Sequence, residues 1–209
     1  MTFTHNYVTA APEIFLAIAS MVLLMIGVFR GDGSTRLLSY LAVLAFAVTL
    51  AIVWQAESAS AVSFAGMYIS DRFTSFAKVL VLIASGAGLI MSQGYIKEEG
   101  MNRFEYPVLF VLATLGMLMM ISANDLIALY MGIELQSLAL YVIAAFNRDS
   151  LRSTEAGLKY FVLGALSSGM LLYGCSLIYG FTGSTGFAEI AAALKGVEKG
   201  SVGLIVGIV

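Results

Sequence analysis

Long apolar runs separated by short polar segments are the dominant pattern of this sequence. A membrane-spanning helix rises ~1.5 Å per residue through a hydrocarbon core ~30 Å thick, and six of the runs are typical of such helices. The expected spans are residues 11–29, 37–54, 73–91, 107–121, 126–146 and 151–181, followed by an incomplete one at 201–209. The pattern predicts an all-α integral membrane protein, in which residues 1–209 form one bundle of six complete helices and the start of a seventh.

Polar residues at the ends of the runs indicate where some helices begin. Asn124 or Asp125 is placed to cap the fifth span, and Asp149 or Ser150 to cap the sixth. The loop after the sixth span is expected to contain a short helix at residues 187–194.

Composition agrees with a membrane protein and excludes several kinds of site. The chain is 60% hydrophobic and only 11% charged, whereas soluble domains are ~25% charged. The net charge is −2, and Lys and Arg do not cluster as nucleic-acid binding requires. Cys175 is the single cysteine and His5 the single histidine, which excludes an internal disulfide and argues against a metal site built on Cys or His.

The distribution of Lys and Arg predicts the orientation in the membrane. The loops at 30–36, 92–106 and 147–158 lie on one side, and the loop at 55–71 lies on the other. The first side holds Arg30, Arg36, Lys97, Arg103, Arg148 and Arg152, against Arg72, Lys195 and Lys199 on the second. The richer side is expected to be cytoplasmic, which leaves the N-terminus on the outer side of the membrane.

Two charged residues near the ends of spans have simple interpretations. Glu13 lies in the first turn of the first span, where a carboxylate stabilises the positive end of the helix dipole, so we expect it at the water interface rather than buried. Lys78 lies a turn or two inside the third span and is expected to extend its ammonium group to the interface.

One acidic residue, Glu134, lies near the middle of the fifth span. An ionised carboxylate at that depth costs roughly 2.5–3.5 kcal/mol, and the neighbouring Ile133 and Leu135 offer no compensation. Ionisable residues inside spans commonly take up and release protons or ions. The alternative is a permanently neutral carboxyl group that makes one hydrogen bond to another helix.

Lys159 is the candidate partner of Glu134. It lies inside the sixth span, which a short connection joins to the fifth, so the two spans are expected to be neighbours. We expect the two residues to differ in depth by ~5–8 Å, a gap that long side chains or one water could bridge, so that they share a proton. The alternative is that Lys159 extends to the cytoplasmic face, where Glu155 lies one turn earlier.

Three motifs carry a family resemblance. They are MGIEL around Glu134, RSTEAGLKYF at the entry of the sixth span, and GALSSGMLLYG within it. Together they resemble subunit N of bacterial complex I, the proton-pumping NADH–quinone oxidoreductase, over residues 123–187, and the first four spans match that family more weakly. The resemblance implies an antiporter-like membrane subunit with one proton channel, driven by quinone reduction elsewhere in the complex.

The resemblance also implies site residues, partners and cofactors. It assigns proton transfer to Glu134 as the family's mid-membrane glutamate of helix 5, and to Lys159 as its lysine at the entry of helix 6. NADH, FMN, iron–sulfur clusters and quinone are expected in other subunits, and no cofactor or metal in this chain. The expected partners are the other complex I membrane subunits, the lipid bilayer and protons. Relatives continue well beyond this length, so the chain is expected to be the N-terminal part of a longer subunit.

Two other functions stay open. A related subunit of a cation/proton antiporter or of a membrane-bound hydrogenase would share the glutamate of helix 5. A non-pumping structural subunit would keep Glu134 neutral and use it only for packing.

Overall fold

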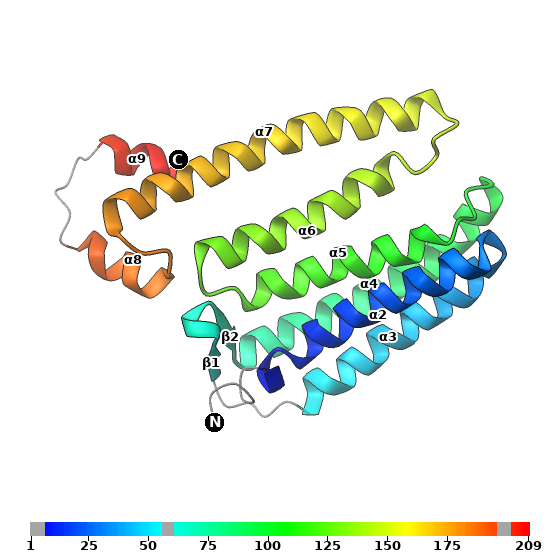
Figure 1. Cartoon of the computed structure of the whole chain (residues 1–209), viewed down its shortest axis with the longest axis horizontal. Coiled ribbons are helices and arrows are strands. Elements are labelled where there is room, and N and C mark those ends of the chain that lie inside the picture. Colours follow the sequence, from blue (N-terminus) through cyan, green and yellow to red (C-terminus); the bar gives the residue numbers. More distant parts are fainter. Residues whose placement is uncertain (1–6, 56–60, 196–201) are drawn as a thin grey trace.

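The computed structural model describes residues 7–55, 61–195 and 202–209. Six of its helices are long and apolar enough to cross a membrane, which confirms the predicted fold class (Figure 1). They are α2 (Ala11–Arg30), α3 (Thr35–Gln55), α4 (Arg72–Glu98), α5 (Glu105–Ser122), α6 (Leu126–Ala144) and α7 (Leu151–Thr182). The shorter elements are η1 (Asp32–Ser34), β1 (Ala61–Ser63), η2 (Phe64–Gly66), β2 (Tyr68–Ser70), α8 (Phe187–Leu194) and α9 (Val202–Ile208).

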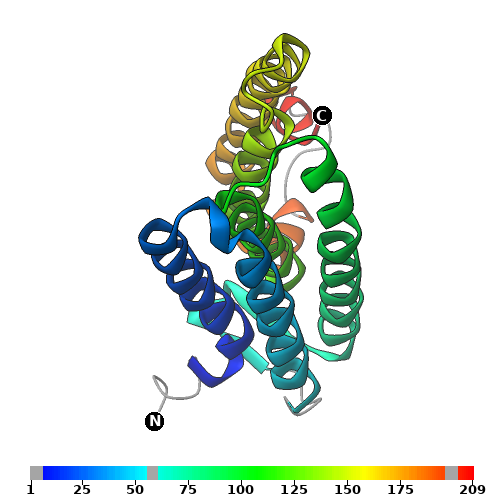
Figure 2. The same ribbon diagram turned by 90° about the vertical axis from the view of Figure 1, so that its right-hand side faces the viewer.

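Helix α5 lies at the centre of the arrangement. Seen from one end, α2, α3 and α4 surround one side of α5, while α6 covers the other side and α7 packs on α6 (Figure 2). The buried hydrophobic core belongs to the first four helices, and its fully buried members include Leu16, Leu38, Leu82, Leu89 and Leu118. Among the residues of α7, by contrast, only Gly157 and Cys175 are buried. The molecule is therefore a packed four-helix bundle that carries α6 and α7 on one flank.

Two glycines let α5 and α6 approach closely. A Cβ atom added at Gly116 would lie 2.8 Å from the carbonyl oxygen of Gly132, and one added at Gly132 would lie 2.8 Å from the backbone nitrogen of Met120. Neither position accepts a side chain unless the backbone moves. Small residues serve this purpose in membrane helix pairs, where close backbone contact replaces the hydrophobic effect. This contact fixes the height of α6 against the core.

The helix boundaries follow the predicted spans closely, with one large difference. The third span was expected to end at residue 91, but α4 continues to Glu98. The polar residues after 91 prolong the helix past its apolar part. The chain turns at Gly100, whose φ of +67° lies in the left-handed region that favours glycine. The short helix predicted at 187–194 is confirmed as α8.

The capping predictions have mixed outcomes. Asp125 caps α6, because its Oδ1 accepts hydrogen bonds from the backbone nitrogens of Ile127 at 2.7 Å and Ala128 at 3.1 Å. Ser150 occupies the cap position of α7 but makes no capping bond with its side chain. Ser153 instead donates to the carbonyl of Ala144 at 3.0 Å, which ties the start of α7 to the end of α6.

The segment 55–71 was expected to be a loop, and its described part contains a β-hairpin. Strands β1 and β2 pair antiparallel, with Val62 opposite Ile69. Each strand has three residues, too few for the alternating pattern that marks a strand in sequence. The hairpin packs over the turn between α5 and α6, where the side-chain nitrogen of Asn124 donates to the carbonyl of Gly66 at 2.8 Å.

The incomplete span expected at 201–209 corresponds to α9, which packs against α7. Its interpretation as the start of a seventh membrane helix stays a prediction.

Candidate functional site

Glu134 lies on the ninth residue of the 19-residue α6, close to its middle, as predicted. Its side chain is half-buried between α6 and α7. The hydroxyl group of Ser168 on α7 donates a hydrogen bond to Glu134 Oε1. Within the described part of the chain, the Ser168 hydroxyl is the only hydrogen-bonding partner of the Glu134 carboxyl group, and it carries no charge. Among the described residues, the Glu134 carboxyl group therefore has a hydrogen bond but no counter-charge.

The Ser168 hydroxyl also connects Glu134 to a second group. The hydroxyl of Tyr130, one turn earlier on α6, lies 3.0 Å from Ser168 Oγ. Each hydroxyl can donate one hydrogen bond and accept others. Glu134, Ser168 and Tyr130 therefore form a hydrogen-bonded series that runs from mid-helix toward the end of α6 where Asp125 caps it.

Lys159 does not contact Glu134. Its Nζ lies 2.6 Å from Oε1 of Glu155, and both side chains are largely exposed, at 70% and 56%. The expected proximity of Lys159 to Glu134 is therefore not observed, and the alternative, a surface pair with Glu155, is the geometry found. The part of both residues in proton transfer stays a prediction.

The register between α6 and α7 explains this outcome. A Cβ atom added at Gly157 would meet Ala145, and one at Gly164 would meet the ring of Tyr141, so these small residues set the two helices side by side. In this register Ser168 is level with Glu134. Lys159 is nine residues earlier, which places it ~13 Å further along the axis of α7 rather than the expected 5–8 Å.

A buried ion pair, which the sequence interpretation missed, lies at the other end of the bundle. Lys78 Nζ lies 2.6 Å from Glu13 Oε1, and their side chains are only 3% and 8% exposed. The predictions that Glu13 lies at the water interface and that Lys78 extends to it are therefore wrong. Both residues turn inward because α2 and α4 start at the same end of the bundle, so each supplies the other with a counter-charge that offsets burial.

Tyr68 of the hairpin completes this cluster. Lys78 Nζ donates to the Tyr68 hydroxyl at 2.9 Å, and that hydroxyl lies 2.9 Å from Glu13 Oε2 and 3.1 Å from the carbonyl of Thr9. Burial, and then the negative charge of Glu13, raise the pKa of Tyr68 well above its usual value. The phenol thus stays protonated and continues to donate. A signal existed in the sequence, since two opposite charges lie within the first two turns of two spans that start on the same side.

Among residues 7–55, 61–195 and 202–209, no group of three or more His, Cys, Asp and Glu side chains is placed to hold a metal ion.

Comparison with known proteins decides the family. A family model described as NADH:quinone oxidoreductase/Mrp antiporter, TM, matches residues 123–209. NADH-quinone oxidoreductase subunit N of Parvibaculum lavamentivorans is 58% identical over 204 residues, which are 98% of this chain and 42% of that relative. Subunit N of Paramagnetospirillum magneticum is 53% identical over 213 residues, 100% of this chain and 44% of the relative. The chain is a homologue of NADH-quinone oxidoreductase subunit N.

The resemblance of the sequence motifs to subunit N is thereby confirmed, and the homology extends through the first four spans. This subunit N homologue spans less than half the length of these curated relatives. Its fold is similar to a chain of respiratory complex I from Thermus thermophilus, with a TM-score of 0.71 and 28% identity over 94% of this chain and 43% of the other. A chain of an archaeal membrane-bound sulfane sulfur reductase has the same fold, with a TM-score of 0.76 and 21% identity over 97% and 42% of the two chains.

The buried ion pair gives a prediction about stability. Lys78→Met leaves the Glu13 carboxylate buried without its counter-charge, which should cost about 3–5 kcal/mol of unfolding free energy. Glu13→Leu combined with Lys78→Met removes both charges, and Tyr68 keeps the Thr9 carbonyl as an acceptor. We expect the double variant to recover most of the loss. Thermal unfolding of the full-length subunit in detergent measures this, and a double variant as unstable as the single one would contradict it.

Proposed function

We propose that this chain is part of a proton-translocating membrane subunit of an NADH–quinone oxidoreductase, in which Glu134 gains and loses the transported proton. The observation that carries the proposal is the position of Glu134: it lies at the middle of a membrane-crossing helix with a neutral hydroxyl as its partner. The homology to subunit N supports the same assignment.

The hydrogen-bonded series of Glu134, Ser168 and Tyr130 offers the proton a route from the middle of α6 toward its N-terminal end. When the Glu134 carboxyl is protonated, its O–H can donate to Ser168 Oγ, and Ser168 can donate onward to Tyr130. In such a transfer each hydroxyl accepts one proton and passes its own proton on. Each group therefore remains a neutral hydroxyl, and the series can be used again once the O–H groups have rotated back. The series is directed toward the membrane side where the hairpin lies.

Lys159 is proposed as the relay group on the opposite side. It stands about two and a half turns before Ser168 on α7, near the end of the bundle that is richer in Lys and Arg. Its exposed pair with Glu155 is weak, so the ammonium group can leave this partner and release a proton to water, and the neutral amine that results can accept the next proton. Direct contact with Glu134 is not part of this proposal.

The remaining assignments rest on the family. We place the richer side, and hence Lys159, in the cytoplasm and the N-terminus in the periplasm, by the positive-inside rule. The other membrane subunits of complex I are the proposed partners. Electron transfer from NADH through FMN and iron–sulfur clusters to quinone is assigned to other subunits, since the sequence offers a single cysteine and a single histidine.

A structural role for Glu134 is the second candidate. The bond from Ser168 is the kind of interhelical hydrogen bond, worth about 1 kcal/mol, that a permanently neutral carboxyl would make. Glu134→Gln separates the two functions, because an amide can accept the same hydrogen bond but cannot release a proton. An antiporter subunit is less favoured, because the relatives with 53–58% identity are named subunit N.

The first functional prediction concerns the carboxyl group itself. Glu134→Gln in the full-length subunit should lower NADH-driven proton uptake into inverted membrane vesicles at least several-fold, while the complex still assembles. Glu98→Gln, which removes an exposed acid at the end of α4, is the matched control and should leave uptake unchanged. Normal uptake in Glu134→Gln at normal assembly would favour the structural role.

The second prediction concerns the hydroxyl partner. Ser168→Ala removes the donor to Glu134 and the link to Tyr130, so we expect slower proton uptake than in the parent, with a smaller loss than for Glu134→Gln. Ser168→Thr keeps a hydroxyl and should retain most of the uptake. Equal rates for Ser168→Ala and the parent would remove the series from the mechanism.

The third prediction concerns Lys159. Because its pair with Glu155 is exposed, Lys159→Met should cost less than about 1 kcal/mol of stability, and any large fall in proton uptake then reports function. Arg152→Met removes an exposed cation about two turns earlier on the same helix and serves as the control. A loss of uptake equal in both variants would indicate a general effect of surface charge.

A further inference from the structure

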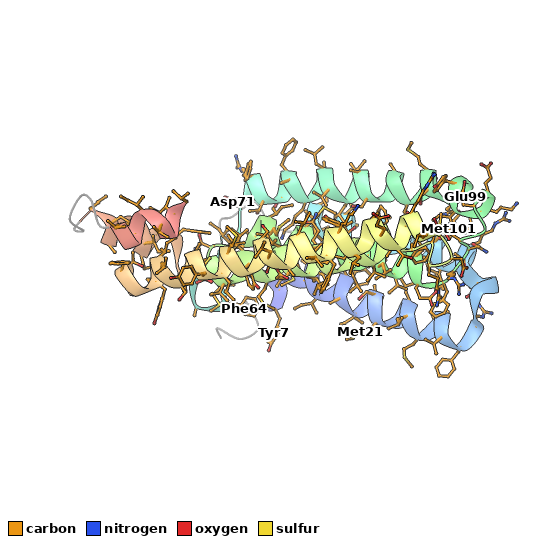
Figure 3. The ribbon with its side chains drawn as sticks, turned by 90° about the horizontal axis from the view of Figure 1, so that it is seen from above. Tyr7, Met21, Phe64, Asp71, Glu99 and Met101 are labelled. Atoms are coloured by element: carbon orange, nitrogen blue, oxygen red, sulfur yellow. The ribbon has the colours of Figure 1, made fainter. Side chains whose placement is uncertain are left out.

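A polar pocket lies at the end of the bundle that is richer in Lys and Arg, away from α6 and α7. It has a volume of about 580 Å³, within the ~300–1,000 Å³ range of ligand sites. The start of α3, the end of α4 and the start of α5 enclose it. In Figure 3, Glu99 and Met101 mark this end of α4, and Asp71 marks the opposite end.

The pocket presents hydrogen-bond donors from several elements. Arg36 on α3 and Lys97 on α4 are its two cations, and the described residues of its lining include no carboxylate. Neither cation has an ion-pair partner within the described part of the chain. Asn102, in the connection into α5, adds an amide, and Tyr106, in the first turn of α5, adds a hydroxyl group.

Gln93 adds an observation that points to a missing partner. It lines the pocket, and its side-chain nitrogen is buried without a hydrogen-bond partner among the described residues. A buried donor left unsatisfied costs ~1–3 kcal/mol. An oxygen-rich anion in the pocket would supply the acceptor and would also neutralise Arg36 and Lys97.

The surroundings of the pocket favour a lipid as the source of that anion. Arg36 and Tyr40 line the pocket, and Leu44, one turn deeper on the same face of α3, is 58% exposed. On α4, Ile90 lies one turn deeper than Gln93 and is 55% exposed. On two adjacent membrane helices, polar groups at the helix ends are thus followed by exposed apolar side chains deeper in the membrane. A phospholipid has the same arrangement, with a polar headgroup followed by apolar acyl chains.

We propose that this pocket binds the phosphate headgroup of an anionic phospholipid, with an acyl chain along α3 and α4 at Leu44 and Ile90. Arg36 and Lys97 hold the phosphate oxygens, and Gln93 donates to one of them. Basic pockets at the ends of membrane helices recognise anionic headgroups in this way. The proposal does not depend on proton transfer through Glu134.

The test uses the intact membrane complex that contains the full-length subunit. A phosphatidylglycerol analogue with a diazirine in its acyl chain is photo-crosslinked, and labelled peptides are identified by mass spectrometry. We expect labelling of the segments around Leu44 and Ile90, competed by unlabelled phosphatidylglycerol but not by phosphatidylcholine. Equal labelling by a phosphatidylcholine analogue would show ordinary bilayer contact and overturn the proposal.

Variants and a free anion complete the test. Arg36→Gln with Lys97→Gln should lower the labelling about tenfold, since each basic residue contributes appreciably to headgroup binding. Arg30→Gln with Arg152→Gln removes the same charge from exposed positions on the same side and should not change it. Unchanged labelling in the first variant, or competition by inorganic phosphate as effective as by phosphatidylglycerol, would overturn the assignment to a lipid. If the first variant does not assemble, the comparison of the two lipids on the parent complex still decides.

Discussion

The cost of removing a charge from water organises the ionisable residues of this bundle. Lys78 and Glu13 are almost fully buried, and they are tolerated because each lies 2.6 Å from the other and both contact the Tyr68 hydroxyl. Glu134 is also inside a membrane-crossing helix but has a hydroxyl group, not a cation, as its neighbour. A buried carboxyl group next to a cation is compensated by the opposite charge, whereas one next to a hydroxyl group has only a hydrogen bond to offset its burial. The same constraint therefore gives a buried ion pair at one place and a carboxyl group with a hydroxyl partner at another.

The positions of the two acids follow from the packing around α5. Glu13 and Lys78 belong to the helices that form the buried core, and their pairing joins α2, α4 and the hairpin into one unit. Glu134 belongs to α6, which the glycine contact at Gly116 and Gly132 holds against this unit. Glu134 thus lies on a helix whose height is set by contact with the packed core, while its own partner comes from the more exposed α7.

Sequence reasoning predicted the six spans, the mid-helix position of Glu134, the cap at Asp125 and the short helix α8, because each depends on local pattern. It failed where the answer depends on which helices are neighbours. Glu13 and Lys78 are 65 positions apart, and only the packing of α2 on the rest of the bundle shows that they meet. The partner of Glu134 was sought in a basic residue, whereas the register set by Gly157 and Gly164 brings Ser168 to it. The hairpin was missed because strands of three residues carry too short a pattern.

The separation between Glu134 and Lys159 limits how they can influence each other. Their levels differ by ~13 Å, and two unit charges at that distance interact by roughly 0.3 kcal/mol in water and ~1.3 kcal/mol at an effective dielectric constant of 20. An interaction of ~1.3 kcal/mol changes a protonation equilibrium nearly tenfold, whereas one of roughly 0.3 kcal/mol changes it less than twofold. Lys159 is 70% exposed here, which favours the weaker limit. The electrostatic coupling between the two groups therefore depends on the dielectric constant of the surroundings of α7. If lipid or protein covered α7 and excluded water, a change of charge on one group would affect the other without direct contact.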